Sequence, residues 1–142
     1  MAGRNDIAFD DILNEYVTYL IDGVTITFDA TQPNGSAAVG RAVMLSGNKT
    51  VALADSNAAI EGKLIKVERD GKCTVQVEGY MNLPGGAGAT LTPGAAVVGA
   101  LGPGNARGYV KAADTAQLAQ VAAGRGRIVD SADPANVWVA LR

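Results

Sequence analysis

The side chains that most often carry out catalysis are scarce in this sequence. Its 142 residues include no histidine and a single cysteine, Cys73. Triads and Cys-His pairs need an imidazole base, and zinc sites and disulfides need several thiolates or imidazoles. Cys73 alternates with Val75 and Val77 in a strand-like run, so we expect a small core side chain and not a nucleophile. Most common enzyme chemistries are therefore excluded.

Carboxylates offer little more. The only close groups are Asp10, Asp11 and Glu15 near the N-terminus, and Asp130 and Asp133 in a sequence typical of a turn. General acid and base catalysis needs two carboxylates that converge on one bond, and a calcium loop needs oxygen ligands at alternating positions. Neither group has such a pattern. We therefore predict a protein that is not an enzyme and binds no cofactor or metal.

The charge is weakly negative overall and unevenly distributed. The net charge is −2 and the pI is near 5.0, which argues against nucleic-acid binding. Residues 1–30 carry six acidic side chains and one basic, a net charge of −5, whereas residues 31–142 carry eight acidic and eleven basic, a net charge of +3. The acidic N-terminal part is either an arm that meets a basic partner surface or a solvated leader.

Residues 79–106 form an uncharged stretch of 28 positions, long enough to cross a bilayer. Eight glycines and three prolines within it would leave backbone groups unpaired in hydrocarbon. We therefore predict a loop or a buried connector and no membrane association. The first residues also lack the apolar run of a secretory signal, so export by that route is not expected.

Glycine and proline together account for 23 residues, and only 18% of the residues are charged. Such a chain, with short runs rich in Val, Ile and Thr, is typical of an all-β barrel or sandwich. Two-residue or short polar turns predict three hairpins. Their strand pairs are 16–21 with 24–28, 38–45 with 50–54, and 62–68 with 73–78.

The two halves of the sequence resemble each other. Residues 61–65 match 125–129 at an offset of 64, and the alternating residues 73–77 match 137–141 at the same offset. Residues 50–56 match 109–115 at an offset of 59. We infer two similar β-units, 38–78 and 93–141, with an insertion in 114–123 that is either a short helix, with Leu118, Val121 and Ala122 at helical spacing, or a strand. In the last strand Trp138 faces away from the core.

Three runs together resemble the small capsid decoration proteins of tailed bacteriophages: 38–45, then 60–67 with 73–79, and 124–129. The likeness covers about residues 16–142 and lies in the composition of the segments and the order in which they occur. It implies a β-rich domain that forms a homotrimer on the outside of an expanded head, where it clamps neighbouring major capsid protein subunits. The protein would be made in the host cytoplasm and end in the virion, on the outer capsid surface.

The predicted organisation is an extended N-terminal arm, 1–15, followed by one small β-barrel or β-tulip-like domain, 16–142, with one short helix. We expect two sets of side chains to make the contacts. The capsid-docking set on the arm comprises Ile7, Phe9, Asp10, Asp11, Ile12 and Leu13. The oligomer-interface set in the uncharged stretch comprises Met81, Leu83, Pro84 and Leu91.

A second function class remains open. Trp138, Tyr80 and Tyr109 would line a recognition face if the chain were a receptor-binding or carbohydrate-binding β module, as in a head fibre. Glycan binding usually requires exposed aromatic rings that lie close together, so the position of these three rings separates the two classes.

Overall fold

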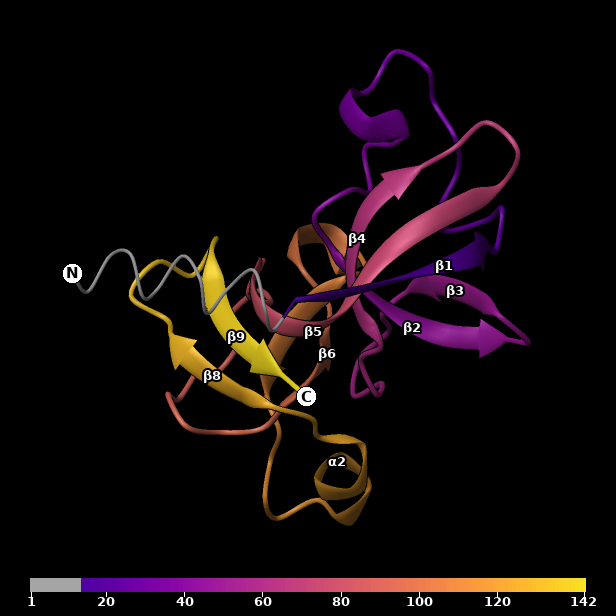
Figure 1. The fold of residues 1–142 in the computed structure, drawn as a ribbon. Coiled ribbons are helices and arrows are strands. Elements are labelled where there is room, and N and C mark those ends of the chain that lie inside the picture. The colour runs from indigo at the N-terminus through magenta and orange to yellow at the C-terminus, as the bar shows by residue number, and fades with distance from the viewer. Residues whose placement is uncertain (1–13) are drawn as a thin grey trace, which may run out of the picture.

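The computed structural model describes residues 14–142, and these residues form an all-β fold with one short α-helix, as predicted. The strands are β1 (Glu15–Ile21), β2 (Ala42–Gly47), β3 (Thr50–Leu53), β4 (Gly62–Val67), β5 (Lys72–Leu83), β6 (Val97–Ala100), β7 (Tyr109–Ala112), β8 (Arg127–Asp130) and β9 (Val137–Leu141). The helices are α2 (Leu118–Ala123) and the 3-10 turns η1 (Pro33–Gly35) and η2 (Pro103–Asn105). They are arranged in two lobes that share β5 (Figure 1).

The first lobe is a closed ring of five strands in the order β1-β3-β2-β4-β5. The ring closes because β1 pairs in parallel with β3 and antiparallel with β5. In the pairing with β5, Tyr19 lies opposite Cys73. A closed ring leaves no sheet edge unpaired. Its core consists of aliphatic side chains and Cys73: Ile26, Ala38, Val43, Val51, Leu53, Leu64, Val67, Cys73, Val75 and Val77.

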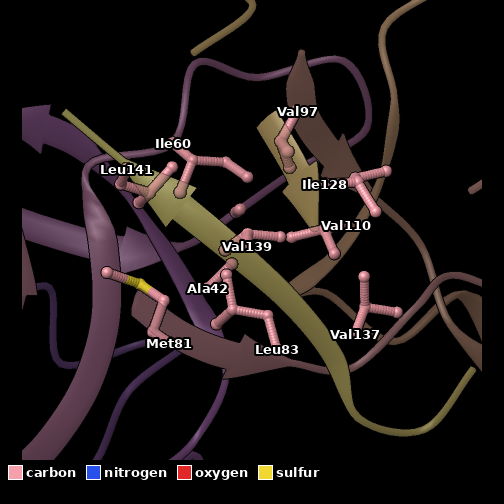
Figure 2. Close-up of a cluster of buried hydrophobic side chains, with 11 residues drawn as sticks. Ala42, Ile60, Met81, Leu83, Val97, Val110, Ile128, Val137, Val139 and Leu141 are labelled. Atoms are coloured by element: carbon pink, nitrogen blue, oxygen red, sulfur yellow. The ribbon is translucent and has the colours of Figure 1, made fainter. Parts of the chain in front are cut away.

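The second lobe begins where β5 continues beyond Gly79. This half of β5 pairs antiparallel with β9, which pairs with β8, and β6 pairs with β7. Single bridges, Gly85 to Val110 and Val97 to Arg125, join these pairs into a second ring. Figure 2 shows its core, which includes Met81, Leu83, Val97, Val110, Ile128, Val137, Val139 and Leu141.

Hydrogen-bond register makes the two rings equivalent. The antiparallel partners Lys63 and Gln76, Leu64 and Val75, and Lys66 and Thr74 in the first ring recur as Arg127 and Ala140, Ile128 and Val139, and Asp130 and Trp138. Every residue is displaced by 64, and the irregularity after Leu64 recurs after Ile128. The two strand pairs are therefore copies of one another in backbone geometry.

The equivalence extends through the remaining strands. The parallel pair Ile21 and Val51 recurs as Gly85 and Val110, so the second half of β5 takes the place of β1. The pair Val43 and Leu53 recurs as Val97 and Ala112. The offset is 64 for the first strand of each copy, 54 from β2 to β6, 59 from β3 to β7, and again 64 for the last two strands. Because the offset changes only between strands, insertions fall only in the connections. The copies span residues 15–78 and 79–142 and begin earlier than the units 38–78 and 93–141 that the sequence indicated.

One glycine position shows how closely the copies agree. A Cβ atom on Gly62 would lie 2.0 Å from the carbonyl oxygen of Gln76, and one on Gly126 would lie 2.1 Å from that of Ala140. These distances are far inside van der Waals contact. Glycine is required at both places because the partner strand passes directly over it.

The hairpin predicted for 16–21 and 24–28 is wrong. Only its first strand forms, and β1 pairs with β3 and β5 instead of with the following residues. The Asp22 carboxylate accepts hydrogen bonds from the backbone N–H groups of Val24, Thr25 and Ile26, at 3.3, 3.0 and 3.0 Å. These bonds hold the chain in a local turn and lead Ile26 into the first core.

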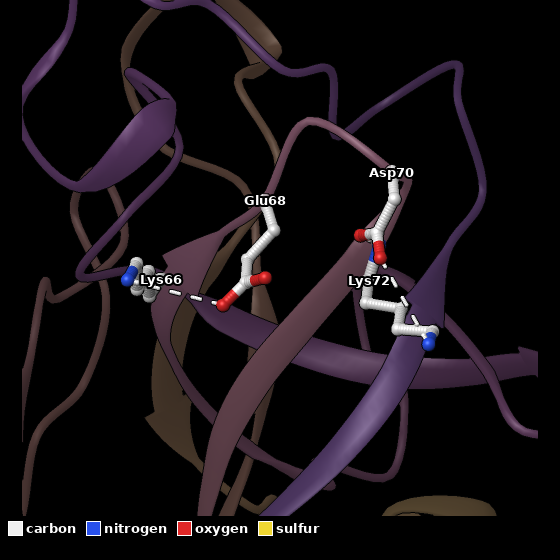
Figure 3. A network of polar contacts seen from close by, with 4 residues as sticks. All are labelled: Lys66, Glu68, Asp70 and Lys72. Atoms are coloured by element: carbon white, nitrogen blue, oxygen red, sulfur yellow. Dashed lines mark hydrogen bonds and ion pairs between the residues drawn. The ribbon is translucent and has the colours of Figure 1, made fainter.

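The other two hairpins are confirmed as β2 with β3 and β4 with β5, although the first strand begins at Ala42 and not at 38. At the tip of the second hairpin, Lys66 pairs with Glu68 and Lys72 with Asp70, both at 3.8 Å (Figure 3). All four side chains are more than half exposed, so each pair contributes about 0–1 kcal/mol. The tip therefore depends on its turn and not on its charges.

Candidate interaction surfaces

The predicted docking arm lies outside the described residues, so Ile7, Phe9, Asp10, Asp11, Ile12 and Leu13 stay a prediction. The first described residue, Asn14, marks where the arm leaves the fold. Its Cα atom would lie 3.0 Å from a Cβ on Gly79, the residue at which β5 passes from one ring to the other. Each ring of strands is a small barrel, and the arm is therefore attached at the junction of the first barrel with the second.

The predicted oligomer interface needs correction. Met81 and Leu83 are 2% and 1% exposed and belong to the second core, with Leu91 packed against that core. They occupy the inward positions that Val17 and Tyr19 hold in the first barrel, because β5 continues as its first strand. These side chains are used within the chain. Pro84 is partly exposed, and the trimer itself stays a prediction.

Arg125 fixes the two barrels to each other. Its guanidinium donates hydrogen bonds to the carbonyl oxygens of Glu61 at 2.6 Å, Ile60 at 3.3 Å, and Val77, and to that of Arg142 at 3.0 Å. Three of these carbonyls belong to the first barrel. These contacts leave Arg125 partly buried, whereas Arg127, two residues further along the chain, is exposed.

A second polar contact lies beside Arg125. The Tyr19 hydroxyl donates a hydrogen bond to the Glu61 carboxylate. Burial, followed by this hydrogen bond and the negative charge of Glu61, raises the pKa of Tyr19 to about 12. The junction thus holds a tyrosine, a carboxylate and an arginine in contact with backbone carbonyls, an arrangement that positions the barrels.

The described residues contain no cluster of three or more His, Cys, Asp or Glu side chains that could hold a metal ion. Cys73 is 1% exposed, and burial raises the pKa of its thiol to about 11. A thiol in that state is a weak nucleophile at neutral pH. The expected role of Cys73 as a core side chain is confirmed. No helix within residues 14–142 is long and apolar enough to span a membrane.

Large apolar side chains are exposed on both barrels. The first barrel presents Tyr16, Leu20, Val24 and Leu45, and the second presents Leu118, Val121, Val129 and Trp138. Tyr16 and Leu20 lie on the outward face of β1. Trp138 lies on the outward face of β9, between Asn82 of β5 and Asp130 of β8, as expected from its place in the sequence. Contact surfaces are therefore available on either barrel.

The three aromatic residues of the alternative function have different environments. Tyr80 and Trp138 occupy neighbouring strands, with Tyr80 opposite Ala140 and Trp138 opposite Asn82, so they lie diagonally on one face. Tyr109 is held elsewhere, with its ring centroid 5.5 Å from the Arg41 guanidinium carbon and its edge against Gly102. Its ring is occupied by these intramolecular contacts. The three rings therefore do not form a single recognition face.

A shallow hollow of about 370 Å³ lies on the first barrel, beside the long connection between β1 and β2. Its lining includes Phe28 and Arg69, whose guanidinium carbon lies 5.4 Å from the centroid of the phenyl ring.

Comparison of the chain with protein-family models, curated proteins and solved structures gave no significant match. Function is therefore inferred from the residues and their arrangement.

Proposed function

We propose that this chain is a structural decoration protein of a tailed-phage head, bound to the outer surface of the virion. It would stabilise the head by clamping neighbouring major capsid protein subunits. The resemblance of residues 38–45, 60–67 with 73–79, and 124–129 to such proteins supports this assignment. The observation that carries it is the joining of two equivalent barrels through one continuous strand, with the acidic arm attached at their junction.

A clamp must transmit force between its contacts, and the junction suits this task. The strand β5 belongs to both rings, and Arg125 links the carbonyl oxygens of Glu61 and Val77 to the second barrel. Shared strands and charge-assisted hydrogen bonds resist hinge motion better than a flexible linker does. Two contact surfaces separated by such a junction keep a fixed spacing.

The arm supplies the second requirement, adhesion. Ordering its backbone costs about 1–2 kcal/mol per residue, whereas each buried side chain such as Ile7, Phe9, Ile12 or Leu13 gains about 1.5–3 kcal/mol. Four apolar anchors do not offset the ordering of fifteen residues. The arm must therefore also form main-chain hydrogen bonds, most simply as an added strand on a capsid subunit, with its carboxylates against basic side chains.

Deletion of residues 2–13 tests this proposal. The truncated chain retains Asn14 and every described strand, so we expect an unchanged circular dichroism spectrum and melting temperature. Co-sedimentation with expanded heads purified without the decoration protein should be lost, because the anchors and carboxylates of the arm are absent. Replacement of Asp6, Asp10 and Asp11 by Asn is the matched control for charge and should weaken binding without abolishing it. Undiminished co-sedimentation of the truncated chain would contradict the docking role.

The proposed homotrimer requires a contact other than Met81 and Leu83. Leu118 and Val121 of α2, which are 83% and 52% exposed, are available for it. Multi-angle light scattering of the intact chain gives the oligomeric state directly, and a monomer at all concentrations would count against trimer formation. Electron microscopy of heads with and without the protein would then give its position and copy number.

One observation favours the alternative, a carbohydrate-binding or receptor-binding module. Trp138 is 45% exposed and is flanked by the polar side chains of Asn82 and Asp130, a combination that suits stacking on a sugar ring. A glycan array separates the two functions when it is combined with the co-sedimentation experiment. Binding to heads without any glycan recognition that depends on Trp138 supports decoration, and glycan recognition that is lost in Trp138→Ala, without binding to heads, supports a receptor module.

A further inference from the structure

The second barrel contains an inserted segment that buries a polar side chain and exposes its large apolar ones. The α2 segment lies where the offset between the copies increases from 59 to 64, so the first barrel has no counterpart. The only buried residue of α2 is polar: Gln120 is 9% exposed, whereas Leu118 and Val121 are largely exposed. The spacing of Leu118, Val121 and Ala122 is that of an apolar helix face, which such a helix normally turns inward. This helix instead turns a carboxamide inward.

The Gln120 carboxamide is only partly satisfied. Its Oε1 atom accepts a hydrogen bond from the backbone N–H of Asp114 at 2.9 Å, which fixes the orientation of the group. Its Nε2 atom donates no hydrogen bond within residues 14–142 and is not among their buried atoms that lack a partner, so it is open to solvent. Water, or a ligand that displaces the water, accepts its hydrogen bonds. Gln120 therefore offers two N–H donors.

These donors belong to the wall of a cavity. The cavity has a volume of about 520 Å³ and is bounded by the segment before β6, the end of β7 and the start of the insertion. It is lined by Thr90, Thr92, Ala95, Lys111, Ala112, Ala113, Asp114, Thr115 and Gln120. The size falls within the range of small-molecule sites, about 300–1,000 Å³. The lining combines three hydroxyls, one ammonium, one carboxylate and one carboxamide with three alanine methyl groups.

Comparison of the barrels separates inherited residues from added ones. Asp114 and Thr115 correspond to Asp55 and Ser56 of the first barrel, and in both turns the aspartate carbonyl accepts a hydrogen bond from the backbone N–H three residues later. Lys111, which pairs with Val98, corresponds to Ala52. The ammonium group of Lys111 and the carboxamide of Gln120 are thus present only in the second barrel. Lys111 forms no ion pair within the described part of the chain.

We propose that this cavity binds an acidic sugar. The Lys111 ammonium and the Gln120 Nε2 group would hold its carboxylate, because a cation and a carboxamide donor together match two carboxylate oxygens. Asp114 and the threonine hydroxyls would accept and donate hydrogen bonds to the ring hydroxyls. Asp114 repels an anion, so the carboxylate must lie on the Lys111 side. This activity is additional to capsid binding and does not depend on it.

Isothermal titration of the purified full chain with glucuronate, glucose and acetate tests the assignment. We expect binding of glucuronate and at least tenfold weaker binding of glucose, which lacks the carboxylate, and of acetate, which lacks the hydroxyls. Equal affinity for glucose and glucuronate would overturn the carboxylate subsite. Equal affinity for acetate and glucuronate would overturn the sugar. No binding of glucuronate at millimolar concentration would overturn the site as a whole.

Two variants place the ligand in this cavity. Gln120→Glu keeps an oxygen acceptor for the Asp114 N–H but replaces the donor by a negative charge, and Lys111→Met removes the ammonium. Each should weaken glucuronate binding at least tenfold with a melting temperature close to that of the wild type. The control Lys72→Met makes the same charge change on the first barrel and should leave binding unchanged. Retention of affinity in both cavity variants would contradict the proposal, and so would an equal loss in the control.

Discussion

The two barrels share their hydrogen-bond register and differ in their connections. In the first barrel Ile21 and Val43 are 22 positions apart, with η1 between them, whereas the equivalent Gly85 and Val97 are 12 positions apart. The second barrel is instead longer after β7, where α2 and its cavity occur. An insertion within a paired strand shifts the register of the pairing, whereas an insertion in a loop leaves the register unchanged. New surfaces have therefore been added only where the ring does not depend on them.

Side chains follow the same division. Inward positions stay apolar in both copies, as in Leu64 and Ile128, which are both buried. Outward positions are free to differ, as Thr74 and the corresponding Trp138 do. One inward position changes character: Tyr19 in the first barrel corresponds to Leu83 in the second, and only Tyr19 reaches Glu61 at the junction. The first barrel is thus adapted to hold its neighbour.

The largest effect is expected at the shared glycine position. Gly62→Ala and Gly126→Ala would each force a methyl group against a carbonyl oxygen of the partner strand and should lower the free energy of unfolding by about 3–5 kcal/mol. Gly126→Ala should cost about 1–2 kcal/mol more, because its φ of +60° is unfavourable for alanine. Urea unfolding measures both. The control Gly47→Ala has room for its methyl group and should change stability by less than about 1 kcal/mol.

Equal tolerance of alanine at Gly47 and Gly62 would show that the close approach of the strands is not a constraint. A loss at only one of the two equivalent glycines would break the correspondence between the barrels.

Loss of the Arg125 contacts should have the next largest effect. Arg125→Met leaves the carbonyl oxygens of Glu61 and Val77 without their charged donor and should lower the free energy of unfolding by about 2–3 kcal/mol. Arg127→Met changes the same charge at an exposed position two residues away and should cost less than about 0.5 kcal/mol. Differential scanning calorimetry compares them. Identical thermograms for the two variants would mean that Arg125 does not hold the barrels together.

The smallest effect is expected at Tyr19, whose equivalent in the second barrel is Leu83. Tyr19→Phe removes one hydrogen bond to a carboxylate and should cost about 1.5 kcal/mol at pH 7. The folded-state pKa of Tyr19, about 12, lies above its unfolded value of about 10. The contribution of the hydroxyl is therefore complete below pH 10 and is lost as the pH rises from 10 to 12. Urea unfolding across that range should show the wild type and Tyr19→Phe converging, and parallel curves would exclude this coupling.

The sequence predicted the fold class because alternation of apolar residues survives in both copies. The repeat of 61–65 in 125–129 and of 73–77 in 137–141 matches the observed register. The equivalence of β1 with the second half of β5 was not predicted, since a strand that serves two rings has no turn to mark it. The signal was present in Tyr16 and Tyr80, which are identical at an offset of 64. The hairpin at Asp22-Gly23 failed because a side chain captured the backbone donors.

The surfaces were less predictable than the fold. Met81 and Leu83 lie in an uncharged stretch, and apolar residues there fit an oligomer contact as well as a core until the topology is known. Arg125 belongs to a run that alternates like any exposed strand, and its partners are backbone carbonyls, which leave no mark in the sequence. Gln120 would have been placed outward, because the apolar residues of the insertion have the spacing of a buried face.

The position of β5 also sets the order in which the chain can acquire structure during synthesis. All strands of the first ring lie within residues 15–83, and its pairings require nothing beyond Glu78. A ribosome that has released residue 78 has therefore supplied a complete barrel. The following residues emerge from a strand that is already paired, so the second copy starts from a fixed first strand and avoids the entropy cost of positioning it. The copy that is synthesised first thus acts as a template for the second.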